Sequence, residues 1–213
     1  MSLDQEFETI KQFNNDNINT LFSHLDNSNI LDYRKNKNYE YGSDDHFEFL
    51  KKKFINGRNI KIEKGQLSEP DPALYFAIKT KLKIEDDDEL KTIQENHNLC
   101  MEMENIIGAI LEEYIYSICK DQKWIWCSGD IVKAIDFIKK NEDGTWEMLQ
   151  VKNSDNSENS SSKKVRKGTT IKMWFRRYSK RKEFNWEELN KIMKSNTFSE
   201  DNFLTFLANK LKT

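Results

Sequence analysis

The sequence predicts a mixed α/β fold in which a central sheet is flanked by helices, with a helical extension at the N-terminus. A segment with apolar residues at helical spacing, Leu90–Lys120, precedes a segment, 130–152, in which apolar and polar residues alternate. The 213 residues, of which 37% are hydrophobic and 33% charged, are sufficient for one well-packed domain. We therefore expect a single domain 1–213, with a mainly helical part at 1–90, a core at 91–182 and closing helices at 183–213.

The N-terminal half contains mainly helical patterns. Apolar residues recur at loose helical spacing in residues 1–60, and the prolines of Ser68–Pro72 predict a turn. The apolar segment Ala73–Lys81 is consistent with either a short helix or a strand. The acidic run Glu85–Glu89 is expected to begin the long helix Leu90–Lys120, because carboxylates are stabilised at the positive end of a helix.

After Gly129 the period of the pattern changes to two, which indicates strands. Asp130–Lys139 is predicted as a strand and Thr145–Lys152 as the strand that returns beside it. Between them, Asp143-Gly144 is a strong signal for a hairpin turn. A further helix is expected to begin in Lys163–Arg177, and the closing helices are predicted at Trp186–Lys194 and Phe203–Leu211.

The distribution of charge is more informative than its total. The net charge is only −2, but residues 159–182 contain ten Lys or Arg and no Asp or Glu. Such a segment can present a basic face to a polyanion. The three cysteines lack the CxxC spacing of a zinc site, and no apolar segment reaches the roughly 18 residues that span a membrane. We therefore expect a cytoplasmic protein without a membrane partner.

The predicted hairpin brings polar side chains to one end of the sheet. Gln150 and Lys152 share a face of their strand, and the tight turn places Asp136 beside them. Mg²⁺ prefers oxygen ligands, which the Asp136 carboxylate, the Gln150 amide and the Val151 carbonyl supply. A bound ion activates water for phosphodiester hydrolysis, and Lys152 can position that nucleophile. The alternative is an ordinary ion pair of Asp136 and Lys152, worth up to about 1 kcal/mol.

These residues resemble the active-site pattern of the PD-(D/E)XK nuclease superfamily, in which a strand-borne Asp is followed by a hairpin and then by (D/E)-X-K. Asp136 in AIDF is similar to the first Asp, and Gln150-Val151-Lys152 in LQVK to the second part. Two residues depart from the pattern, because Ile135 stands in place of Pro and Gln150 in place of a carboxylate. The resemblance implies a restriction-endonuclease-like central mixed sheet and Mg²⁺-dependent hydrolysis of DNA.

In similar nucleases a glutamate from the preceding helix commonly completes the metal site. Glu104 and Glu112 lie on one predicted face of Leu90–Lys120. The resemblance therefore makes both of them candidates for supporting the site. The alternative is that they are solvated glutamates on the helix surface.

A closer resemblance, over residues 100–180, is to the SinI-type restriction endonucleases. It is carried by the helix ENIIGAILEEYI, the run LQVKNSDNSENSSS and the segment from Arg166 through GTT to KMWFR. This resemblance implies a type II restriction endonuclease that cuts double-stranded DNA at a GGWCC-like site. A homodimer is expected, because a symmetric site is cut on both strands. The alternatives are a structure-selective or repair nuclease with the same core, and a non-catalytic nucleic-acid-binding protein in which Gln150 marks a decayed site.

The polar and basic side chains that follow Lys152 are candidates for contact with DNA. Lysine, serine and asparagine suit phosphates, and asparagine also suits adenine edges. Arginine suits guanine edges, for which Arg166, Arg176 and Arg177 are the candidates. The alternative for residues 153–162 is a flexible solvated loop. The complete set of candidates is Asn153, Ser160, Ser161, Ser162, Lys163, Lys164, Arg166, Lys167, Thr169, Lys172, Arg176 and Arg177.

Overall fold

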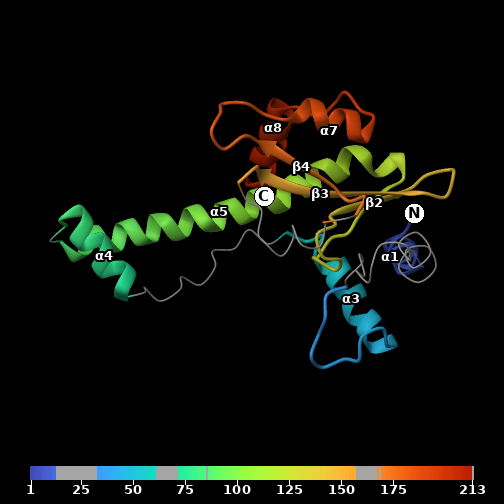
Figure 1. Ribbon diagram of the computed structural model, residues 1–213, viewed down its shortest axis with the longest axis horizontal. Coiled ribbons are helices and arrows are strands. Elements are labelled where there is room, and N and C mark those ends of the chain that lie inside the picture. Colours follow the sequence, from blue (N-terminus) through green and yellow to red (C-terminus); the bar gives the residue numbers. More distant parts are fainter. Residues whose placement is uncertain (13–32, 61–71, 85, 157–166, 168, 213) are drawn as a thin grey trace. The chain divides into compact units, whose positions relative to one another are not determined.

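A computed structural model describes residues 1–12, 33–60, 72–84, 86–156, 167 and 169–212 (Figure 1). The chain forms two compact units. The first comprises Met1–Ile60 and Ile110–Thr213, and the second comprises Lys61–Ala109. The expected division into parts 1–90, 91–182 and 183–213 stays a prediction.

The first unit contains a four-stranded sheet in the order β1-β2-β3-β4. β1 (Trp124–Trp126), β2 (Phe137–Lys140) and β3 (Trp146–Ser154) are antiparallel neighbours, whereas β4 (Lys172–Arg177) runs parallel to β3. The predicted central mixed sheet is therefore confirmed. β1 was not predicted, because three residues are too few to show a period.

The predicted β2–β3 hairpin is also confirmed. Phe137 pairs with Leu149, and the pairing continues to the turn, where the Asn141 N–H donates to the Thr145 carbonyl. Gly144 has φ of +83°, a conformation that glycine adopts without steric strain.

The strand predicted at Asp130–Lys139 is shorter than expected, because β2 begins only at Phe137. Asp130 and Ala134 have positive φ values of 53° and 58°, which interrupt an extended strand. Val132 forms only an isolated bridge with Tyr33. The apolar residues of this segment are buried in the core beside the N-terminal helices, so their spacing reflects packing rather than a strand.

The helix predicted at Lys163–Arg177 is wrong for the part that the structure describes as β4. Residues 172–177 alternate between more and less exposed positions, and Trp174 is buried. Their pairing partner is β3, with Lys172 opposite Leu149, so the pairing joins residues on either side of a long connecting segment. A local pattern cannot reveal such a pairing, which overrides helix propensity.

Six α-helices accompany the sheet within the described residues. Ala73–Lys81, for which helix and strand were both open, is helical, and the long central and C-terminal helices are confirmed. Of residues 1–60, the described helices cover Leu3–Gln12 and Asp44–Asn56. Residues 13–32, and 68–71 of the predicted turn, lie outside the described residues. No described helix combines the length and the apolar character that crossing a membrane requires. The helices are α1 (Leu3–Gln12), α3 (Asp44–Asn56), α4 (Pro72–Leu82), α5 (Asp87–Cys119), α7 (Trp186–Met193) and α8 (Glu200–Lys210).

Helices pack against the sheet of the first unit in two groups. α1 and α3 share a core cluster with the sheet, in which Phe7 and Phe54 join Ile138 and Met148. α7 packs against β4, where the rings of Trp174 and Trp186 lie 5.2 Å apart between centroids. The rings of Trp186 and Phe203 join α7 to α8.

Candidate active site

Asp136 lies at the entry to β2 and its carboxylate rests against β3. Its N–H donates to the Leu149 carbonyl at 2.9 Å. Its Oδ2 accepts a hydrogen bond from the Val151 N–H at 2.6 Å. Val151 is the residue between Gln150 and Lys152, so the structure brings Asp136 next to the Gln-Val-Lys segment.

Gln150 is a buried polar residue whose amide oxygen lacks a partner. Its side chain lies on β3 and the residue is 2% exposed. No hydrogen-bond donor reaches Oε1 from any residue that the structure describes. A buried acceptor without a partner costs about 1–3 kcal/mol. Such an oxygen is suited to bind a hard cation, which would satisfy it.

Glu112 extends from α5 and belongs to the same unit as the sheet. Its Oε2 accepts a hydrogen bond from the indole N–H of Trp126 at 2.8 Å. Burial raises the pKa of Glu112, the negative charge of Asp136 raises it further, and Trp126 and Lys152 act against both. The electrostatic coupling links Glu112, Asp136 and Lys152 into one cluster.

The pKa of Asp136 is also raised, to about 6. Burial is the main cause, and the Val151 hydrogen bond and the charge of Lys152 partly oppose it. Two carboxyl groups with raised pKa values in one cluster are typical of functional sites. A divalent cation would relieve both the burial of their charge and their mutual repulsion.

The two glutamate candidates differ in position. Glu112 lies in the first unit with the sheet, whereas Glu104 is exposed in the second unit. Within the described residues, no three His, Cys, Asp or Glu side chains gather in an arrangement that could hold a metal ion. A metal ion beside Asp136 would therefore need an amide or main-chain oxygen as well as carboxylates.

The predicted DNA contacts at Ser160, Ser161, Ser162, Lys163, Lys164 and Arg166 lie outside the described residues. Lys167, Lys172 and Arg177 are exposed, and Thr169 is partly exposed. Asn153 is partly buried, and its Oδ1 accepts a hydrogen bond from Arg176.

Arg176, a candidate for guanine readout, is paired within the protein. It is 8% exposed, and its Nε donates to Asn153 Oδ1 at 2.9 Å. Its Nη1 donates to Glu200 Oε1 at 2.5 Å. Arg176 therefore ties β4 to the start of α8, where its charge is already paired.

Trp126 is the residue of this cluster that sequence reasoning missed. Its contact with Glu112 joins β1 to α5. The sequence carries no signal for this contact, because both the strand and its position against the helix depend on the fold.

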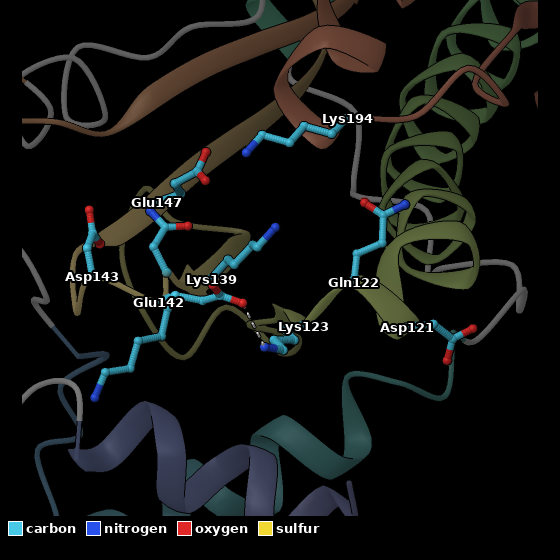
Figure 2. A pocket seen from close by; sticks show the side chains of 10 residues that line it. Asp121, Gln122, Lys123, Lys139, Glu142, Asp143, Glu147 and Lys194 are labelled. Atoms are coloured by element: carbon cyan, nitrogen blue, oxygen red, sulfur yellow. Dashed lines mark ion pairs between the residues drawn. The ribbon is translucent and has the colours of Figure 1, made fainter.

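A pocket of about 710 Å³ lies elsewhere in the first unit. Figure 2 shows Lys139 and Lys194 reaching into it from β2 and from the end of α7. Asp136, Gln150 and Lys152 do not line it. Its charges balance, so it has no preference for a polyanion. The charged residues that line it are Lys123, Lys139, Lys140, Lys194, Asp121, Glu142, Asp143 and Glu147.

Comparison with known proteins extends the similarity over nearly the whole chain. The family model of the SinI restriction endonuclease matches residues 4–213. The type II restriction enzyme Eco47I of Escherichia coli is 40% identical over 171 residues, which cover 80% of this chain and 74% of that protein. The type II restriction enzyme SinI of Salmonella infantis is 40% identical over 173 residues, which cover 81% of this chain and 75% of that protein.

Proposed function

Because the chain belongs to the SinI restriction endonuclease family, we propose that it hydrolyses double-stranded DNA at a short specific sequence with Mg²⁺ as its cofactor. Membership of the family makes the chain a type II restriction endonuclease, an enzyme that binds DNA and uses a divalent metal ion. The finer features are our proposals. They are Mg²⁺ as the ion, a GGWCC-like site, a homodimer and action in the cytoplasm.

The proposed ligands of the ion are a carboxylate oxygen of Asp136, the Gln150 amide oxygen and the Val151 carbonyl oxygen. The observation that supports them most is the buried Gln150 Oε1, which has no hydrogen-bond partner among the described residues and stands next to the residue that binds the Asp136 carboxylate. When bound, the ion polarises the phosphodiester and lowers the pKa of a water molecule.

Lys152 and Glu112 are proposed to complete the site. Lys152 is partly exposed, so its ammonium can reach a phosphate or an attacking water and stabilise developing negative charge. Glu112 supplies the second negative charge, which Gln150 lacks, and its coupling to Asp136 supports this role. Glu104 stays a candidate for the same supporting role.

The proposed DNA contacts fall into two groups. The exposed side chains of Lys167, Lys172 and Arg177, together with Thr169, are suited to phosphates or base edges. Asn153 and the candidates between residues 160 and 166 continue the same stretch of chain after Lys152. Two copies of the chain, related by the two-fold axis of the DNA, would cut one strand each.

The proposal is tested by digestion of phage DNA with Mg²⁺, in which wild type is compared with Asp136→Ala and Lys152→Ala. Matched controls are Glu142→Ala and Lys140→Ala, which remove the same kinds of charge from exposed positions of the same hairpin. Wild type and both controls should give discrete fragments, and the two site variants should give none. Undigested DNA with wild type, or unchanged cutting by Asp136→Ala, would overturn the proposed function.

A further inference from the structure

We propose that Trp126 is a positioning residue, whose indole N–H holds the Glu112 carboxylate in place for the metal ion. A buried brace of Glu6, Arg58 and Tyr116 in turn holds Trp126. This inference rests on the proposed function, because it concerns the same metal site. It assigns a role to the N-terminal part of the chain, which contains none of the proposed metal ligands.

The first step is the contact between Trp126 and Glu112. The indole Nε1 donates to Glu112 Oε2 at 2.8 Å, which leaves Oε1 of the same carboxylate for a metal ion. Trp126 is buried in β1, and the centroid of its ring lies 5.7 Å from that of Tyr116 on α5. One hydrogen bond therefore fixes the carboxylate of a helix residue to a strand of the sheet.

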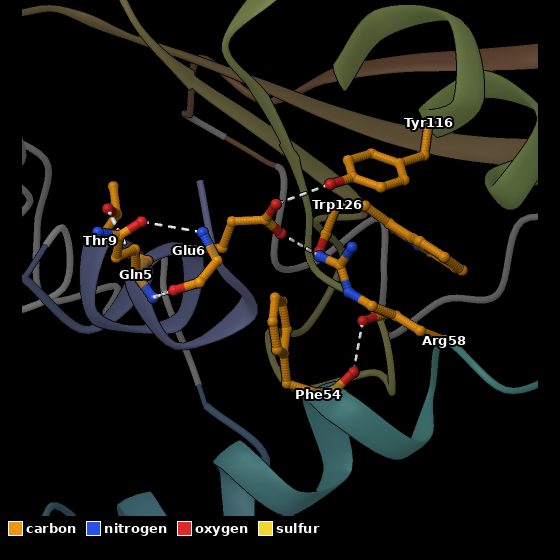
Figure 3. A network of polar contacts seen from close by, with 9 residues as sticks. Gln5, Glu6, Thr9, Phe54, Arg58, Tyr116 and Trp126 are labelled. Atoms are coloured by element: carbon orange, nitrogen blue, oxygen red, sulfur yellow. Dashed lines mark hydrogen bonds and ion pairs between the residues drawn. The ribbon is translucent and has the colours of Figure 1, made fainter. Parts of the chain in front are cut away.

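The second step is the brace behind Trp126 (Figure 3). The Arg58 guanidinium lies 4.7 Å from the ring centroid of Tyr116 and 5.5 Å from that of Trp126. Its Nη2 donates to the Trp126 carbonyl at 3.2 Å and also pairs with Glu6. The Tyr116 hydroxyl donates to the other oxygen of Glu6 at 2.7 Å. Residues of α1, of α5, of β1 and of the segment that follows α3 thereby come into contact.

The brace acts through geometry rather than through charge. Glu6 and Arg58 are both largely buried and neutralise each other, so together they add no net charge near Glu112. Replacing one partner of such a pair leaves the other as an unpaired buried charge, which is strongly destabilising. The intact pair therefore holds the side chains around it in place. Hydrogen-bond partners of metal ligands typically change metal affinity by about 10- to 100-fold when they are replaced.

The test compares Trp126→Phe with Trp124→Phe. The first substitution removes the donor to Glu112 and retains an aromatic ring. The second is a matched control from the same strand, because the indole nitrogen of Trp124 is buried and has no hydrogen-bond partner among the described residues. Two quantities are measured. They are the Mg²⁺ concentration for half-maximal cleavage, and the Kd for Mn²⁺ without DNA, from the electron paramagnetic resonance signal of the free ion.

For Trp126→Phe, both quantities should rise about tenfold, while KM for DNA stays unchanged and excess Mg²⁺ restores kcat. Trp124→Phe should match wild type. Arg58→Lys keeps the charge beside Glu6 but removes the planar group against Trp126. It should shift both quantities in the same direction. If Trp126→Phe does not fold, Arg58→Lys serves as the test in its place.

Three results would overturn the inference. The first is that Trp126→Phe leaves the half-maximal Mg²⁺ concentration and the Kd for Mn²⁺ unchanged. The second is that both tryptophan variants shift these two quantities equally. The third applies where Trp126→Phe does not fold, and it is that Arg58→Lys leaves both quantities unchanged. Each of these leaves the proposed function intact if wild type cuts DNA with Mg²⁺. A wild type that cuts no DNA with Mg²⁺ overturns the proposed function, and the inference with it.

Discussion

Replacement of Asp136 by asparagine is expected to stabilise the metal-free protein while it abolishes cleavage. Burial raises the pKa of Asp136 from 3.8 to about 6, against the opposing effects of the Val151 hydrogen bond and of Lys152. A carboxyl group whose pKa is higher in the folded protein than in the unfolded chain opposes folding once it is ionised. The difference between 3.8 and about 6 corresponds to at most about 3 kcal/mol of unfolding free energy.

The pH dependence of this effect has a definite sign. Below about pH 4 the carboxyl group is protonated in both states, so Asp136 then opposes folding least. Between pH 4 and 6 the unfolded chain ionises before the folded protein, and wild type loses stability relative to the variant. Above pH 6 the full difference remains. The asparagine amide oxygen can still accept the hydrogen bond from Val151, so the variant retains that contact.

The assay is urea unfolding at pH values from 4 to 8 in the presence of a chelator, repeated with Mg²⁺. Asp143→Asn is the control, because hydrogen bonds from Thr145 lower the pKa of Asp143 and its substitution should reduce stability at neutral pH. Mg²⁺ should stabilise wild type and not Asp136→Asn. If Asp136→Asn is no more stable than wild type at pH 7.5 without metal, the reasoning from burial is refuted.

Three further predictions concern single side chains. Gln150→Glu should tighten Mg²⁺ binding, measured by calorimetry, and lower the unfolding free energy of the metal-free protein at neutral pH, measured by urea unfolding. A Mg²⁺ affinity equal to that of wild type would contradict this prediction. Arg176→Met should lower the unfolding free energy by about 3–5 kcal/mol, because the largely buried carboxylate of Glu200 loses its ion-pair partner and keeps only the hydrogen bond from the Trp186 indole. A loss below about 1 kcal/mol would contradict it. Gly129→Ala should lower Tm more than Gly144→Ala. Both glycines have positive φ, but only a Cβ added at Gly129 would lie 2.1 Å from a main-chain oxygen, that of Lys53. Equal losses of Tm would contradict this prediction.

The elements that the sequence predicts correctly are those with local signals. The Asp143-Gly144 turn and the long helix α5 each depend on residues close together in the chain. β4 pairs in parallel with β3, and a connecting segment separates the two strands in sequence. A local pattern within either strand therefore does not indicate that they pair. The segment before β2 was misread because its apolar residues face the N-terminal core.

The candidate site divides in the same way. Asp136, Gln150 and Lys152 can be found from the sequence, because one hairpin brings them together. The choice of Glu112 as the partner of this cluster requires the fold, since it depends on where α5 lies against β1. For Arg176, too, the fold reveals contacts that the sequence does not show. A basic residue in a basic segment suggests a surface contact, but here its strand turns the side chain towards Glu200.

The amide at Gln150 gives the candidate site one negative charge fewer than a carboxylate would. The carboxylates of Asp136 and Glu112 supply the negative charge that remains. A carboxylate there would be a third acidic group close to Asp136 and Glu112, whose pKa values are already raised by burial. An amide keeps the ligand oxygen and avoids that repulsion in the metal-free protein. In the proposed site, the second negative charge for a divalent ion would come from the α5 carboxylate of Glu112, which is held from outside the hairpin by Trp126. Dependence on the Trp126 contact is thus the consequence expected when a strand carboxylate is replaced by an amide.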